Sequence, residues 1–414
     1  MTTIDLVAAV IFAIALIHTF AAKSIEHLAH SHPKHAGLLH LMGEIEVVFG
    51  LWALILMIAM AILSGGETAI TYVESRHYTE PLFVFVIMVI AASRPVLEFV
   101  KLLIASISRM VPLATAVAQV WCCMALVPLI GSLITEPAAM TLAALMLAPL
   151  VFRPGMPEWL KYGALGVLFV NVSIGGTLTS FAAPPVLMVA ARWSWDSAFM
   201  ATHFGWKALL AVMINASAIT FLLRKHLDDQ QVEQVGERMP LTVSAVHLVF
   251  LVGVVVFAHH PVIFIGLFLF FLGFTKAYER FQNPLILKEG LLVGFFLAGL
   301  VVLGGMQQWW LQPIVSSLGP RSLFFGALGL TAITDNAALT YLGSLIEGMS
   351  DASKYALMAG AVAGGGLTVI ANAPNPAGVA LLREGFEDQS IGVLGLLAGA
   401  ALPTAVAAAA FLVG

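Results

Sequence analysis

The chain has 414 residues, of which 60% are hydrophobic and only 10% are charged, 23 of them acidic and 19 basic. Soluble globular domains carry roughly 25% charged residues, so this composition excludes an ordinary soluble protein and predicts an all-α polytopic membrane protein. The formal net charge of −4, with no basic stripe, also excludes a nucleic-acid partner.

Apolar runs of about 20 residues mark the expected membrane-spanning helices. Ten ranges are predicted as spans: 4–22, 43–63, 81–104, 163–191, 206–224, 241–258, 261–275, 290–305, 355–382 and 391–412. With the N-terminus outside, most Lys and Arg residues fall in inner loops, as the positive-inside rule requires. We therefore expect a multi-pass integral protein of a bacterial inner membrane, with both termini outside.

Two further apolar ranges, 111–150 and 321–347, contain polar residues at their centres. Glu136 lies in the first, and Asp335 and Asn336 lie in the second. A polar tip between two short apolar arms is typical of a re-entrant hairpin, because non-helical backbone at membrane depth is tolerated only where protein or water covers it. The sequence thus predicts two re-entrant hairpins.

The two tips are similar in sequence: residues 134–141 read ITEPAAMT and residues 333–340 read ITDNAALT, with five of eight positions identical. A glycine-broken span follows each tip, over 163–191 and 355–382. The same elements in the same order predict an inverted repeat, with residues 1–224 as the first half, 225–240 as a cytoplasmic linker and 241–414 as the second half. Each half would cross the membrane five times.

The carboxylates of Glu136 and Asp335 are the first candidates for chemistry. A carboxylate at membrane depth costs roughly 2.5–3.5 kcal/mol even on the milder insertion scale, and it usually marks an ion or proton path. Either a proton or a cation relieves that cost, so one carboxylate can exchange H⁺ for Na⁺. If the hairpins were instead ordinary helix pairs, both acids would lie in loops outside the membrane.

Neutral oxygens surround these acids in the sequence and suit a hard cation such as Na⁺. The candidates at the tips and breaks are Thr135, Thr334, Asn336, Thr177, Thr179, Ser180, Thr368, Asn372 and Asn375, together with the backbone carbonyls freed at the breaks. The alternative is that the small residues serve close helix packing.

Secondary candidates are Asn171 and Ser173, just before the first break, and Arg94 and Glu98, which are four residues apart across Pro95. The latter two predict either an intrahelical ion pair or a gating role. Six histidines between positions 18 and 40, most of them in the loop 27–40, fit a solvated loop, a pH sensor or a metal site.

The tips and broken spans resemble those of the ion transporter superfamily, and the acidic tips are most similar to NhaD-type sodium/proton antiporters. The resemblance implies two re-entrant hairpins whose tips meet two discontinuous helices at a central cation site. It also implies a homodimer with a scaffold and a mobile transport domain. The Ser-Asn-Thr tips of the dicarboxylate branch are absent.

The predicted function is secondary Na⁺ (or Li⁺)/H⁺ exchange by alternating access, with a Na⁺ site at Glu136 and Asp335. No resident cofactor is expected, since Na⁺ and H⁺ would be the transported species, and no Gly-x-x-x-x-Gly-Lys-[Ser/Thr] motif is present. An anion or organic-acid symporter of the same superfamily remains an alternative. An intramembrane aspartyl hydrolase, with Glu136 and Asp335 sharing a proton, is a remote one.

Overall fold

The computed structural model describes residues 2–31, 35–228 and 239–413. Every regular element in these ranges is a helix, which confirms the all-α class. Two compact units are formed from discontinuous parts of the chain: unit 1 comprises Met1–Phe85, Leu287–Gly319 and Tyr341–Ser350, and unit 2 comprises the remainder. Because the predicted halves rest on internal similarity and not on compactness, these units do not test them.

Unit 1 is built mainly from six helices: α1 (Thr3–Ser31), α2 (Ala36–Gly43), α3 (Ile45–Ser64), α4 (Gly66–Glu74), α15 (Leu287–Gly304) and α16 (Gln308–Ser316). Helices α3 and α15 pack closely, because a Cβ on Gly299 would clash with the backbone of Phe49 and Gly50. Small residues at such an interface let two apolar helices approach. Helices α5 (Thr79–Ala91) and α18 (Asn336–Ser344) contribute residues to both units.

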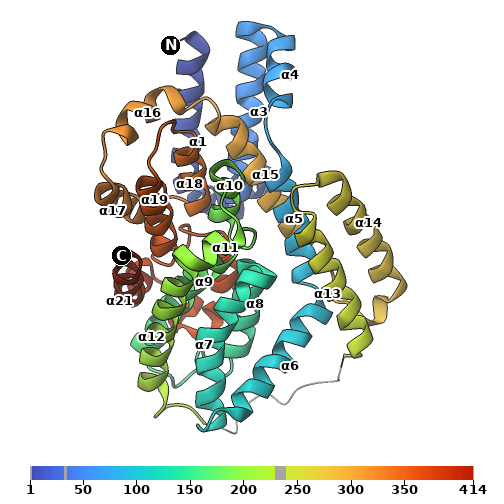
Figure 1. The fold of residues 1–414 in the computed structure, drawn as a ribbon, viewed down its shortest axis with the longest axis vertical. Coiled ribbons are helices and arrows are strands. Elements are labelled where there is room, and N and C mark those ends of the chain that lie inside the picture. Colours follow the sequence, from blue (N-terminus) through green and yellow to red (C-terminus); the bar gives the residue numbers. More distant parts are fainter. Residues whose placement is uncertain (1, 32–34, 229–238, 414) are drawn as a thin grey trace. The chain divides into compact units, whose positions relative to one another are not determined.

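Unit 2 holds both breaks and both tips. Its helices are α6 (Arg94–Met110), α7 (Thr115–Ile134), α8 (Glu136–Leu147), α9 (Glu158–Gly175), α10 (Pro184–Trp193), α11 (Ser197–Met200), α12 (Trp206–Leu223), α13 (Leu241–Val256), α14 (Pro261–Ala277), α17 (Pro320–Thr331), α19 (Asp351–Gly364), α20 (Asn375–Leu382) and α21 (Val393–Leu412). Short 3₁₀ turns η2 (Gly176–Leu178), η5 (Glu279–Phe281), η6 (Arg383–Gly385) and η7 (Glu387–Gln389), and a π-helical turn η3 (Ala201–Gly205), lie between them. Helices α7, α8 and α9 pack together, as do α17 and α19 (Figure 1).

The chain is interrupted at the four places where the sequence predicts interruption. Helix α7 gives way to α8 at Thr135, and α17 gives way to α18 over residues 332–335. Helix α9 resumes as α10 only at Pro184, and α19 resumes as α20 only at Asn375. Prolines in the first turns of α8, α10 and α20 explain where each resumes, since proline lacks the N–H that a helix interior requires.

Five helices among the described residues are long and apolar enough to cross a membrane: Glu46–Ser64, Thr115–Ile134, Ser197–Leu223, Leu287–Gly304 and Val393–Leu412. A sixth results if α5 and α6 count as one span. The expectation of one continuous span over 81–104 is corrected, because α5 and α6 meet at a 63° bend just before Arg94 and Pro95. The count of ten spans remains a prediction.

Candidate functional site

Glu136 opens α8 and is completely buried. Its Oε2 atom accepts a hydrogen bond of 2.9 Å from the side-chain amide of Asn372, which lies in the break between α19 and α20. Its Oε1 atom is buried and has no hydrogen-bond partner among the described residues. The carboxylate therefore joins the first tip to the second break and keeps one oxygen available for a proton or a cation.

Gly176 makes room for that carboxylate, because a Cβ at this position would clash with Glu136 Oε1. A similar arrangement is found at the second tip and break. A Cβ on Gly365 would clash with Ser173 Oγ and would lie 3.0 Å from Asn336 Nδ2. Asn336 opens α18 as Glu136 opens α8, and it too is completely buried.

Further contacts place each broken helix parallel to the first arm of the preceding tip. Three residues of α9 and the break after it, spaced four apart, lie against three backbone carbonyl oxygens of α7 that are also spaced four apart. Three residues of α19 and the break after it lie in the same way against carbonyl oxygens of α17 and the residue that follows it. The pairs are Asn171 with Met124, Gly175 with Pro128 and Thr179 with Ser132 in the first half, and Gly360 with Phe324, Gly364 with Leu328 and Thr368 with Ala332 in the second. The residues that supply the carbonyl oxygens are separated by a constant 200 positions between the two sets: 124, 128 and 132 against 324, 328 and 332. The residues that lie against them are separated by a constant 189 positions: 171, 175 and 179 against 360, 364 and 368.

This correspondence pairs Glu136 with Asn336, again 200 residues apart, and Gly176 with Gly365, again 189 apart. Sequence similarity alone had matched Glu136 with Asp335. By the same separation of 200 residues, Asp335 aligns with Thr135, the residue just before the helix, one residue away from the alignment that sequence identity gives.

Asp335 is partly exposed, and its Oδ1 accepts hydrogen bonds from the backbone N–H groups of Ala337 (2.8 Å) and Ala338 (3.1 Å). These bonds cap the first turn of α18. Asp335 is near enough to Glu136 for their charges to act on each other, but Glu136 is buried and Asp335 is partly exposed.

Thr135 has a φ of 78°. A β-branched residue is a genuine outlier at positive φ, and such strain persists where the surrounding structure imposes it, often at functional sites. Thr135 Oγ1 is buried and has no hydrogen-bond partner among the described residues.

Buried polar side-chain atoms without a hydrogen-bond partner among the described residues (orphaned atoms) are concentrated at the tips and breaks. Buried polar groups are normally hydrogen-bonded, so each exception requires an explanation. In the described part of the chain, the exceptions at the tips and breaks are Thr135 Oγ1, Glu136 Oε1, Thr331 Oγ1, both side-chain atoms of Asn336, Asn372 Oδ1 and Asn375 Oδ1. All but one of these seven atoms are oxygens, the ligand type that hard cations take.

Other predicted oxygens are already engaged with the protein. The hydroxyl groups of Thr177, Thr179, Ser173, Thr334 and Thr368 each donate to a backbone carbonyl, and Ser180 bonds to Ser197. The carbonyls of Gly365 and Thr368, expected as cation ligands, accept from Asn375 Nδ2 at 2.8 Å each. That amide therefore satisfies backbone groups that the break in the helix would leave open.

Two of the secondary candidates, Asn171 and Glu98, interact with other parts of the protein. Asn171 donates to Met124 and Val212 and accepts from Asn215, so it joins α9 to α7 and α12. The predicted ion pair between Arg94 and Glu98 is wrong, because Glu98 pairs instead with Lys101 at 3.3 Å, one turn further along α6.

The structure tests only part of the histidine cluster. His18 is buried and hydrogen-bonds through both ring nitrogens, to Met42 O and to Trp52 Nε1. The side chains of His27, His30 and His32 lie outside the described residues. Among the side chains that are described, no three His, Cys, Asp or Glu residues form a metal-binding group.

Sequence reasoning did not identify Ser132 or Thr331. Ser132 donates to Gly175 O at 2.7 Å and accepts from Leu178 N–H at 3.0 Å, so it fixes the first break to α7. It lies in the last turn of α7, four residues before Glu136 and across the break at Thr135, and its place directly before the polar tip is the signal that could have found it.

Comparison with known proteins assigns the chain to a family. None of the curated proteins compared with the chain matches it. Residues 3–413, nearly the whole chain, match the family described as "Putative Na+/H+ antiporter". The chain therefore belongs to that antiporter family, and its apolar helices are those of an integral membrane protein.

Proposed function

We propose that the protein exchanges Na⁺ (or Li⁺) for H⁺ by alternating access, with Glu136 as the group that binds either ion. One observation carries the proposal: a completely buried carboxylate with one oxygen bonded to Asn372 and the other without a hydrogen bond among the described residues. Burying a bare carboxylate is costly, and either a proton or a cation offsets that cost. The two ions therefore compete for the same oxygen.

Neutral oxygens complete the proposed Na⁺ site. Asn372 follows Ala371, whose carbonyl accepts from the backbone N–H of Asn336 at 3.1 Å, so residues 371–372 link Glu136 to Asn336. Orphaned amide oxygens on Asn336, Asn372 and Asn375 supply ligands without adding charge.

The repeated contacts support an inverted-repeat architecture with two re-entrant hairpins. Three contacts at each broken helix, and the glycine against each tip, recur at constant separations along the chain. In the proposed architecture each half crosses the membrane five times, so the second half begins on the opposite side and both termini would lie outside. Paired broken helices at matching positions are the arrangement expected around a transporter's central site.

The charge at this site favours electroneutral exchange. Glu136 is completely buried, its counterpart Asn336 is neutral, and Asp335 is a partly exposed helix cap. One carboxylate that exchanges one proton for one Na⁺ moves no net charge, so we propose a stoichiometry of one to one.

Purified protein in liposomes with a trapped pH indicator tests both statements. An imposed Na⁺ gradient is expected to drive opposite proton movement, at a rate that does not change when K⁺ and valinomycin clamp the membrane potential at different values. Glu136→Gln, which keeps size and hydrogen bonding but not charge, is the matched control and is expected to show no exchange. A pH signal indifferent to Na⁺ and Li⁺ would reject exchange, whereas a Na⁺-dependent rate that follows the potential would reject only the stoichiometry.

A further inference from the structure

A second potential binding site lies in unit 2, apart from the tips and breaks. It is a cavity of about 690 Å³ at the beginnings of α12, α17 and α19 and the end of α21. Its lining contains none of the tip or break residues. The π-helical turn Ala201–Gly205 borders it, and such turns are frequent at functional sites.

Lys207 is the central polar group of this cavity. Its side chain is buried, with only 6% exposure, and its Nζ donates to the hydroxyl of Tyr355 at 2.9 Å, which in turn donates to Phe411 O. The Tyr355 ring centroid lies 4.7 Å from the ammonium, which stabilises the charge partly. Among the described residues no carboxylate lies within ion-pair distance of Lys207. A buried ammonium with three N–H donors and no carboxylate is a complement for an anion.

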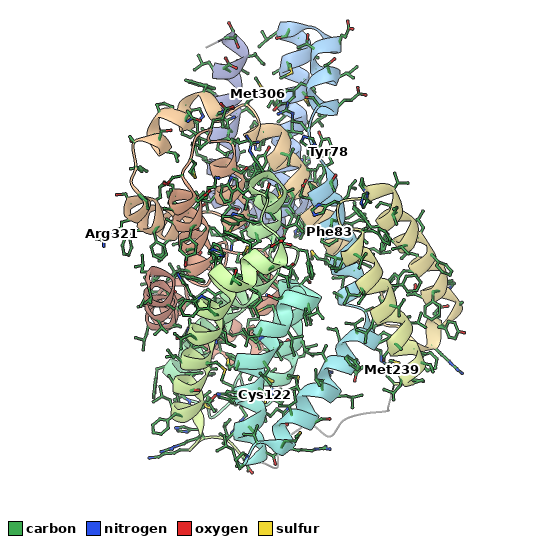
Figure 2. The ribbon with its side chains drawn as sticks, viewed as in Figure 1. Tyr78, Phe83, Cys122, Met239, Met306 and Arg321 are labelled. Carbon is green, nitrogen blue, oxygen red and sulfur yellow. The ribbon has the colours of Figure 1, made fainter. Side chains whose placement is uncertain are left out.

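The surroundings add positive potential. Arg321 lines the cavity and projects outward from the first turn of α17 (Figure 2). Helices α17 and α19 run parallel, as their contacts show, so their positive N-terminal ends point to the same side. The lining carboxylate, Asp351, is 94% exposed and pairs with Lys354 at 2.9 Å, so the buried polar group of the cavity is Lys207.

The walls of the cavity are aromatic, formed largely by Trp206, Phe324, Tyr355 and Phe411. The cavity lies at the ends of two membrane-length helices, Ser197–Leu223 and Val393–Leu412, where lipid head groups are expected. Beyond it, Leu209 and Leu210 of α12 are about half exposed and offer an apolar surface. A soluble anion cannot pack against that apolar surface, whereas the acyl chain of a lipid can.

We propose that this cavity binds the phosphate head group of an anionic phospholipid, with Lys207 and Arg321 as its cationic contacts. Basic pockets between membrane helices recognise such head groups through charge, while the acyl chains lie along the apolar helix. The aromatic walls exclude water and strengthen the pairing of Lys207 with the phosphate.

Thermal unfolding of the purified protein in detergent, titrated with dioleoylphosphatidylglycerol, dioleoylphosphatidylcholine or inorganic phosphate, tests this proposal without any transport assay. Phosphatidylglycerol is expected to stabilise the protein saturably, and phosphatidylcholine is not. Arg321→Gln is expected to weaken the lipid affinity about fivefold, as for the loss of one surface charge near an anionic lipid. Lys207→Gln should weaken it further, Lys207→Arg should restore it, and Arg192→Gln, outside the cavity, should leave it unchanged.

If Lys207→Gln fails to fold, Arg321→Gln and Lys207→Arg still carry the test. Equal stabilisation by inorganic phosphate and phosphatidylglycerol, lost in the same variants, would establish an anion site but overturn the lipid as its occupant. Equal effects of both lipids, unchanged in every variant, would overturn the site itself.

Discussion

The two tips have the same place in the fold but not the same charge. Glu136 and Asn336 each begin a helix, are completely buried and face a glycine of the following break. The residues just before them differ as well: Thr135 is held at positive φ, whereas Asp335 caps its helix. One half thus has its carboxylate inside the site, and the other half has its carboxylate at the edge.

In the proposed inverted repeat, this difference leaves a single buried carboxylate at the two matching positions. Two carboxylates in equivalent buried positions would repel each other whenever both are ionised. An amide in the second position keeps the oxygen ligand and avoids that repulsion. The asymmetry makes the contributions of the two halves separable by substitution.

The largest expected effect separates Glu136 from Asp335. Glu136→Gln should reduce Na⁺-driven proton movement to the rate of protein-free liposomes, because no group remains to bind either ion. Asp335→Asn should retain exchange with a modestly higher KM for Na⁺, because Asn also caps helices well and only a neighbouring charge is lost. The pH-indicator assay measures both, and loss of exchange in Asp335→Asn with a folded protein would restore Asp335 as an ion ligand.

The next effect concerns Asn336. Asn336→Asp places carboxylates at both equivalent positions, so the pair should bind one proton more than the wild-type site does. When one Na⁺ displaces both protons, exchange moves net charge, and with Na⁺ leaving and H⁺ entering the liposome its rate should rise when the interior is made negative. Rates under a valinomycin clamp measure this, with Asn336→Gln as the neutral control. An exchange rate of Asn336→Asp that does not change with the membrane potential would contradict the assignment of Asn336 as the counterpart of Glu136.

Much of this architecture is predictable from the sequence, because breaks in helices are local chemistry. Glycine pairs and prolines set where α9 and α19 end and where α10 and α20 begin. The family prediction, made from the tips and broken spans, is confirmed over residues 3–413. The buried position of Glu136 also agrees with the interpretation of its cost in an apolar segment.

The register of the second tip could not be predicted in the same way. Sequence identity aligns Thr135 with Thr334, whereas the packing of α19 on α17 aligns Thr135 with Asp335. A shift of one residue in this alignment changes which side chain of the second tip matches Glu136. Only the contacts of one helix with the backbone carbonyls of the other determine the alignment. The roles of Asn171 and Asn375 were also inaccessible, since an amide in a span can bind an ion or another helix equally well.

A smaller effect is expected from the two glycines that face the tips. Gly176→Ala would force Glu136 to move and should raise the KM for Na⁺, by roughly tenfold for an overpacking cost of about 1.4 kcal/mol. Gly365→Ala meets mainly the hydroxyl of Ser173, so the double variant Gly365→Ala/Ser173→Ala should recover most of its loss. Transport kinetics of the three variants measure this, and a double variant as impaired as Gly365→Ala would place the conflict elsewhere.

The smallest expected effects are on stability and have opposite signs in the two halves. Thr135→Gly should stabilise the folded protein by about 1 kcal/mol, because glycine adopts a φ of 78° without steric cost. Asp335→Ala should destabilise it by about 1 kcal/mol, because the first turn of α18 loses its cap. Thermal unfolding in detergent measures both, with Asp335→Asn as a variant that keeps the cap. Equal destabilisation by Asp335→Asn and Asp335→Ala would mean that the charge of Asp335, and not its hydrogen bonds, stabilises the second tip.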